Sequence, residues 1–228
     1  MTDFSEDFDS PVFPLPETVF YPKTTLSLLV FEPRYLAMVD TALKGDRLVS
    51  MANFQPGWEE EYFGNPAIRE MVCVGKIVNH QRLADGNVHI TLLGLTRARV
   101  LSEDFSRDYR MARLKAIPDA SPGEDEWALT LRKAREVLKL WRATATPEKL
   151  KTVTVSNWEN PVEDELVSFS YKLADTLKVD INAKIGLREA QSTLERLEME
   201  RSILSEVAEV LSKGIRRLGG IFYGFSLN

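Results

Sequence analysis

The two histidines of this 228-residue chain are the first candidates for acid–base or metal chemistry. His80 and His89 lie on either side of Asp85 and Gly86, a pair of residues that favours a tight turn between two strands. Symmetric positions across such a turn face each other, so the histidines would form a metal or acid–base pair. A hydrolase that uses either histidine is one hypothesis. The spacing marks no third ligand, however, and the plainer interpretation is two polar residues on a strand face.

The sequence lacks the other common signatures of catalysis. Cys73 is the single cysteine and lies between Val72 and Val74, which is typical of an inert core residue in a strand. No GxxxxGK[ST] loop is present to hold ATP phosphates, and no GxSxG turn is present to expose a nucleophile. We therefore expect a protein that is not an enzyme, with no catalytic residue, no metal and no cofactor.

A group of arginines suggests a different kind of site. Four of them lie on predicted neighbouring strands and would form a basic strip for RNA: Arg97, Arg99, Arg110 and Arg113. The composition opposes this alternative, because 34 acidic and 29 basic residues give a net charge of -5. Ion pairs with Glu32, Glu103 or Asp104 are the plainer role for these arginines. Nucleic acid is therefore not an expected partner.

An aromatic loop between residues 54 and 68 is the leading candidate for a contact surface. Rigid rings recover much apolar area at a small cost in entropy, so Phe54, Trp58, Tyr62 and Phe63 favour binding of an exposed peptide segment. The acidic run 59–61 would favour basic peptides. The alternative is a long loop that folds back over the sheet and buries its rings.

The elements that must position these residues change character along the chain. Residues 1–10 are acidic and expected to be disordered, residues 11–118 show the short alternating runs of a β domain, and residues 119–228 have helical spacing. The clearest elements are a hairpin that joins 72–83 to 88–95, a helix from Pro33 to Gly45, and a last helix from about Leu187 to Lys213. An aromatic tail follows. It packs on its own chain or enters a neighbouring subunit, so a homo-oligomer through the last helix or the tail is one expectation.

Two blocks of the β half resemble the amino-terminal, substrate-binding domain of the Lon protease family. They read FPLPETVFYPKTTLSLLVFEPRY from Phe13 and GKIVNHQRLADGNVHITLLGLTRARV from Gly75. The order and spacing of the blocks carry the resemblance, and the helical half is similar to the family at Lys184, Leu187 and Arg196. The residues that match the family pattern, to which a structural role is assigned, are Pro14, Pro22, Phe31, Glu32, Pro33, Arg34, Tyr35, Gly75, Asp85, Gly86, Gly94 and Arg97.

The resemblance implies an α+β fold in which a PUA-like six-stranded pseudo-barrel is followed by an α-helical bundle. It also implies substrate recognition, with protein or unfolded peptide segments as partners and a separate protease as a further partner. Because the ATPase and peptidase modules of Lon are not found in these residues, we expect a stand-alone, non-catalytic adaptor; a PUA-like RNA-binding module is the alternative. The single cysteine and the lack of a long apolar run indicate a cytoplasmic protein without a membrane partner.

Overall fold

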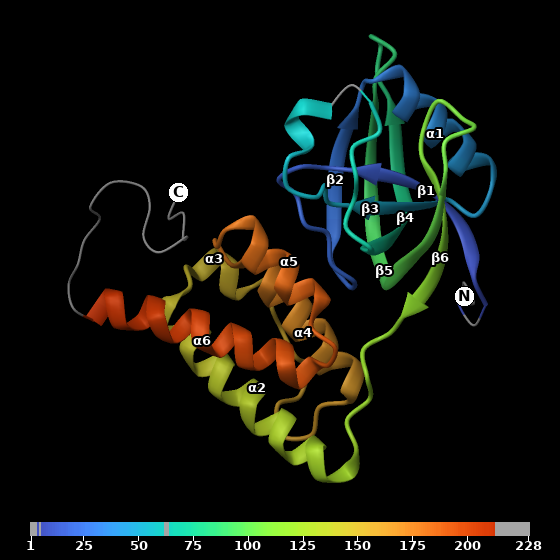
Figure 1. Cartoon of the computed structure of the whole chain (residues 1–228). Coiled ribbons are helices and arrows are strands. Elements are labelled where there is room, and N and C mark those ends of the chain that lie inside the picture. Colours follow the sequence, from blue (N-terminus) through green and yellow to red (C-terminus); the bar gives the residue numbers. More distant parts are fainter. Residues whose placement is uncertain (1–3, 5, 62–63, 213–228) are drawn as a thin grey trace. The chain divides into compact units, whose positions relative to one another are not determined.

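The computed structural model describes residues 4, 6–61 and 64–212, and it divides into two compact units (Figure 1). The first unit, residues 1–118, is built from strands, and the second, residues 119–228, from helices. We call them the β unit and the helical unit and describe each by itself. In the described part of the chain, no helix combines the length and the apolar character needed to cross a membrane.

The strands of the β unit form one sheet that closes on itself. Within the described residues six strands follow the order β2-β5-β4-β3-β1-β6, and β5 also pairs with β6. The long strand β5 makes this closure, because its first part pairs with β2 and its last part with β6. The strands are β1 (Phe8–Pro14), β2 (Thr25–Val30), β3 (Leu48–Ala52), β4 (Met71–Arg82), β5 (Val88–Asp104) and β6 (Met111–Ile117).

The predicted hairpin is confirmed as β4 and β5. Gly86 has a φ of 88°, which favours glycine, and the Leu83 N–H donates to the Asn87 carbonyl at 2.8 Å to close the turn. The Asp85 carboxylate accepts from the Asn87 N–H at 3.0 Å. This local chemistry is readable from the sequence because a turn depends on only a few neighbouring residues.

One helix packs against the sheet, as predicted. Helix α1 (Pro33–Lys44) starts at a proline, whose missing N–H costs nothing at a helix start. Its buried face lies in the same apolar core as Phe13, and the Tyr35 ring stacks on Phe13 with centroids 4.2 Å apart. The inward residues of the helix are Tyr35, Met38, Val39 and Ala42.

Gly94 lies where the segment before β2 passes directly over β5. Its N–H donates to the Thr24 carbonyl and its carbonyl accepts from the Lys23 N–H, both at 2.9 Å. A Cβ at this position would be 2.0 Å from the Tyr21 carbonyl oxygen, so no larger residue fits without moving the main chain. This close approach explains the glycine of the second sequence block.

The acidic start of the chain is less disordered than predicted. Strand β1 begins at Phe8, so residues 8–10 of the segment expected to be disordered belong to the sheet. Asp9 forms a 3.5 Å ion pair with Arg113 on β6, and the buried Ser10 hydroxyl accepts from Ser50 at 2.9 Å. The prediction was wrong there because pairing partners far along the chain supply the order.

The helical unit contains five helices in its described part. The predicted last helix is divided in two, because residues 190–192 separate α5 from α6. Ser192 and Glu195 cap the second piece: the Glu195 N–H donates to Ser192 Oγ at 3.2 Å, and the Glu195 carboxylate accepts from the Gln191 N–H at 2.6 Å. The aromatic tail lies outside the described residues. The helices are α2 (Glu124–Thr144), α3 (Pro147–Leu150), α4 (Glu163–Thr176), α5 (Ile181–Glu189) and α6 (Thr193–Ser212).

Candidate functional site

A small pocket of the β unit joins residues from the first sequence block, from the predicted contact loop and from the segment before β6. Its cavity has a volume of about 20 Å³, enough for one water molecule. The start of α1 supplies Arg34 and Tyr35, and the segment between β5 and β6 supplies Arg110. The remaining wall includes Pro14 and Asn65. We call this cavity the arginine pocket.

Arg34 is held at the mouth of the arginine pocket by its neighbours in the EPRY motif. Its Nε donates to Glu32 Oε2 at 3.0 Å, and its guanidinium lies 4.6 Å from the centroid of the Tyr35 ring. The side chain keeps 30% of its surface exposed. Arg34 is therefore oriented by the protein but remains open to a ligand.

Arg110 forms the buried wall of the same pocket. Its Nη2 donates to the Pro66 carbonyl at 2.6 Å, and its Nη1 forms an ion pair with Glu103. Burial lowers the pKa of Arg110, while Glu103 beside it opposes that shift. The guanidinium also lies 5.1 Å from the ring centroid of Phe105. The result is a fixed cation with an aromatic ring beside it.

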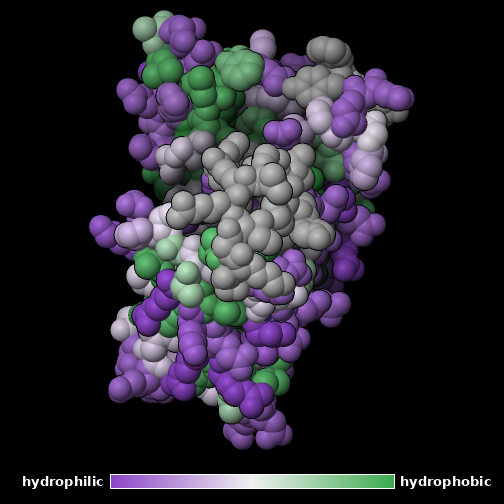
Figure 2. All heavy atoms as spheres, turned by 90° about the vertical axis from the view of Figure 1, so that its left-hand side faces the viewer, coloured by the Kyte–Doolittle hydropathy of each residue, from purple (hydrophilic) through white to green (hydrophobic). Residues whose placement is uncertain are grey.

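One exposed phenylalanine contacts Arg110, and another comes shortly before Arg34 in the sequence. Phe31 is 62% exposed and comes just before Glu32 and Arg34, whereas Phe105 is 47% exposed and contacts Arg110. Leu29, 44% exposed, lies two residues before Phe31 at the end of β2. Figure 2, which views the β2 side of the β unit, shows hydrophobic surface gathered at its upper left among hydrophilic residues. Large apolar side chains left in water are costly, and they are common at binding surfaces.

The predicted contact loop is placed differently from the prediction. Phe54 is only 9% exposed and belongs to a core cluster with Ile68, and the Trp58 ring stacks on it with centroids 5.2 Å apart. Tyr62 and Phe63 lie outside the described residues. For Phe54 and Trp58, the structure favours the alternative in which the loop folds back onto the sheet.

The arginines of the predicted RNA strip do not form one exposed surface. Arg97 and Arg110 are buried, and Arg97 Nη2 donates to the Pro118 carbonyl at 3.4 Å. Arg113 is exposed but pairs with Asp9, and Arg99 lies opposite Lys115 on β6. The ion pair of Arg110 with Glu103 is the one expected from the sequence.

The two histidines do not face each other. His80 lies opposite Ile90, and His89 lies opposite Gln81, so the histidines are one register position apart and their side chains point to opposite faces. The turn itself sets this offset: the Leu83 N–H donates to the Asn87 carbonyl, so the loop is centred on Asp85 and position 80 pairs with position 90. Cys73 is fully buried in the core. Among the described residues, no group of three histidine, cysteine or acidic residues is arranged to hold a metal.

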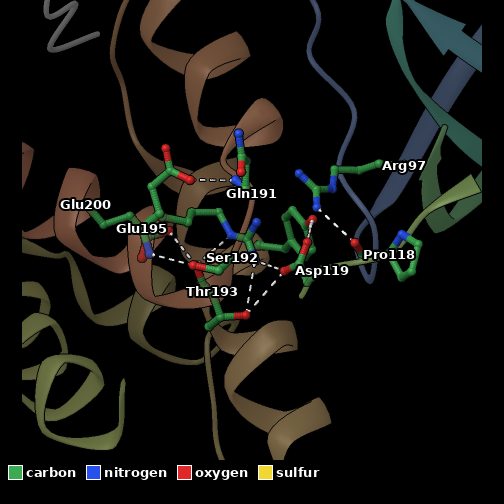
Figure 3. Close-up of polar contacts among 11 residues, drawn as sticks. Arg97, Pro118, Asp119, Gln191, Ser192, Thr193, Glu195 and Glu200 are labelled. Carbon is green, nitrogen blue, oxygen red and sulfur yellow. Dashed lines mark hydrogen bonds and ion pairs between the residues drawn. The ribbon is translucent and has the colours of Figure 1, made fainter. Parts of the chain in front are cut away.

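The helical unit contains a second charged cluster, and it is buried. Arg196 forms an ion pair with Asp119, its Nε donates to Ser170 Oγ at 2.8 Å, and its guanidinium lies 3.6 Å from the Tyr171 ring centroid. Figure 3 shows Thr193 pointing toward Asp119, to which its hydroxyl donates at 3.2 Å. Burial lowers the pKa of Arg196, but Tyr171, Asp119 and Glu200 together raise it by more, so the guanidinium stays charged. The cluster ties α4 and α6 to the segment before α2, and we assign it a structural role.

Glu200 lies beside this cluster, and the pKa of its carboxyl predicts how the stability of the helical unit depends on pH. Its burial raises the pKa of the carboxyl well above the usual value, and Arg196 offsets only part of that shift. Near pH 4 the carboxyl is protonated in both states. As the pH rises, the unfolded chain loses this proton first, so Glu200 lowers the free energy of unfolding at neutral pH.

We therefore expect Glu200→Gln to stabilise the helical unit at pH 7 and to have no effect near pH 4. A rise in melting temperature of roughly 2 to 4 °C is expected at pH 7. The exposed Glu198 on the same helix gives the control, Glu198→Gln, which removes the same charge without removing a buried group. A gain at pH 4 as large as the gain at pH 7 would contradict the assignment.

The sheet and the helices that follow it define an α+β protein, and comparison with known proteins gives its family. The sequence matches the model of the ATP-dependent protease La (LON) substrate-binding domain over residues 9–206. The chain therefore belongs to the Lon substrate-binding domain family, as its two sequence blocks predicted. Because the match covers most of both units, it includes the helices as well as the sheet.

Individual relatives agree with this family assignment. The chain is 29% identical over 210 residues to Lon protease 2 of Myxococcus xanthus, covering 85% of this chain and 24% of that protein. It is 26% identical over 219 residues to the Lon protease of Anaeromyxobacter dehalogenans (strain 2CP-C), covering 89% and 25%. The chain thus spans about a quarter of the length of these relatives.

Solved structures confirm the predicted α+β fold. The N-terminal domain of the Mycobacterium avium complex Lon protease superposes with a TM-score of 0.66 at 15% identity, covering 87% of this chain and 99% of that one. A Lon N-terminal domain protein from Xanthomonas campestris gives a TM-score of 0.54 at 20% identity, covering 84% and 95%. Both structures have the mixed architecture of a sheet followed by helices.

Sequence reasoning did not predict the exposure of Phe31 and Phe105. Phe31 was assigned a structural role with the rest of its block, and Phe105 was not singled out. The available signal was a lone phenylalanine inside the charged run SEDFSRDYR, residues 102–110. A large apolar residue with only polar neighbours has no core to join locally, which is typical of a contact residue.

Proposed function

We propose that this chain binds exposed segments of other polypeptides and carries out no catalysis itself. The observation that supports the proposal is the exposure of two phenylalanines near the pocket: Phe105 lies against Arg110, and Phe31 comes three residues before Arg34. Aromatic and arginine side chains are the residues that most often dominate protein binding energy. Membership of a substrate-binding family agrees with this use.

The proposed mechanism is reversible docking of an unfolded segment. An extended apolar segment would bury part of the two phenylalanine rings, and each ring has few rotatable bonds to immobilise. In this proposal the chain works as a substrate-recognition module or adaptor that delivers unfolded clients to a separate protease. Binding would not require ATP or a metal.

Substitution of the exposed phenylalanines tests the proposal. We expect Phe31→Ser and Phe105→Ser each to weaken binding of a labelled peptide that alternates Leu and Ser by about tenfold. Fluorescence anisotropy on the purified full chain measures the affinity. Both rings lie at the surface, so the melting temperature should stay close to that of the unchanged chain.

The matched control replaces an exposed apolar residue elsewhere. Val162 is 61% exposed at the start of α4, and Val162→Ser should leave the affinity unchanged. Equal losses from all three exchanges would indicate nonspecific apolar adhesion. If the unchanged chain fails to bind the peptide at all, the proposed function is wrong.

A further inference from the structure

We propose that the arginine pocket binds one carboxylate of the polypeptide, so that the chain prefers apolar segments that carry an acidic group. This inference rests on the proposed function and gives it a chemical selectivity. The carboxylate comes from the end of a chain or from an aspartate or glutamate side chain. Both sources present the same two oxygens, and the experiment below separates them.

The guanidinium donors that line the pocket, and not the sum of charges around it, favour an anion. Arg34 and Arg110 contribute two positive charges, and the exposed Asp108 contributes one negative charge. Glu32 and Glu103 pair with the two arginines, but each occupies only part of a guanidinium that carries five N–H donors. Nη1 of Arg34 makes no hydrogen bond within the described residues. A donor is therefore left at the mouth for a ligand oxygen.

The start of helix α1 adds to this preference. The helix has twelve residues, its first turn after the Glu32 N-cap holds no acidic side chain, and no side chain caps it. Pro33 has no N–H and the Tyr35 N–H donates to the Glu32 carbonyl at 3.0 Å, which leaves the Arg34 N–H. The positive end of the helix dipole lies at Arg34 and Tyr35, which also line the pocket. Helix end and guanidinium groups thus act on the same ligand position.

The size of the cavity limits what can enter. A volume of about 20 Å³ holds one water molecule, so a single carboxylate oxygen fits where a ring or a nucleobase does not. The exposed Phe31 precedes Arg34 by three residues, and Phe105 contacts Arg110. An apolar side chain on either ring therefore leaves a nearby carboxylate within reach of the pocket.

Four peptides of one apolar sequence test the inference on the full chain. The first two differ only in a free or an amidated carboxyl end, and the other two are amidated and carry either Asp or Asn at one internal position. We expect the free acid, the Asp peptide or both to bind about tenfold more tightly than the neutral partner, since hydrogen bonds to charged groups are the strong ones. Calorimetry measures each affinity.

Variants of the chain test whether Arg34 causes the preference for the charged peptides. In Arg34→Gln the charged and neutral peptides should bind within about twofold of each other. Lys44→Gln removes one positive charge at the exposed far end of the same helix and should keep the full preference. Arg34 is partly exposed, so its exchange leaves the core intact.

Two results would overturn the inference and leave the function standing. One is equal affinity within both peptide pairs while all four peptides bind, and the other is a preference that persists in Arg34→Gln. Failure of all four peptides to bind would instead contradict the proposed function itself.

Discussion

Gly94→Ala is expected to destabilise the β unit by about 3 kcal/mol or more, because the added methyl group has no space. The new Cβ would be 2.0 Å from the Tyr21 carbonyl oxygen and 3.0 Å from Pro22 Cα. Both contacts are with main chain, which cannot rotate away as a side chain can. Tyr21 is fully buried, so the shift would propagate into the core. Hydrogen exchange of β-unit peptides, followed by mass spectrometry in increasing urea, measures the loss.

Two other glycines of the same unit make the prediction specific. At Gly75 an added Cβ would be 2.8 Å from Cε1 of Phe20, a side-chain atom, so a smaller loss is expected. At Gly45 the nearest atoms are 3.9 and 4.0 Å away and φ is −112°, so alanine should be tolerated. The expected order of destabilisation is Gly94, Gly75, Gly45. Equal effects at Gly94 and Gly45 would show that the close approach to Tyr21 is not maintained in solution.

Arg196→Met is expected to destabilise the helical unit by about 3 to 5 kcal/mol, the cost of leaving one buried charge without its partner. Asp119 has a side chain only 6% exposed, and its carboxylate would lose the positive charge beside it while the Tyr171 and Thr193 hydroxyls still donate to it. Ser170 would lose the donor on its hydroxyl oxygen as well. Urea unfolding followed by hydrogen exchange of helical-unit peptides measures the change.

A second substitution distinguishes whether the loss of stability comes from the unpaired charge or from lost packing. Adding Asp119→Asn to Arg196→Met removes the uncompensated carboxylate, so the double variant should be more stable than Arg196→Met alone. Arg201→Met on the exposed side of the same helix is the matched control and should have little effect. A double variant that is less stable than the single one would assign the loss to packing around Tyr171.

Features that depend on a few neighbouring residues could be predicted from the sequence. The β4–β5 hairpin follows from Asp85 and Gly86, and the start of α1 follows from Pro33. Ser192 and Glu195 carry a capping signal of the same local kind, and that signal would have placed the start of α6 correctly. The family resemblance followed from ordered blocks and supplied the α+β fold before any contact was known.

The site itself was decided by tertiary structure. Its walls come from β1, from the start of α1, from the loop before β4 and from the segment before β6, and no spacing rule joins positions so far apart in the chain. Burial also depends on partners elsewhere. Phe54 packs with Ile68 in the core, whereas Phe31 and Phe105 stay exposed. The sequence by itself determined the elements whose signals are local, such as the β4–β5 turn and the start of α1, because turn angles and helix caps depend on neighbouring residues. Only the folded chain decided which arginines and aromatic rings meet, because burial depends on the whole unit.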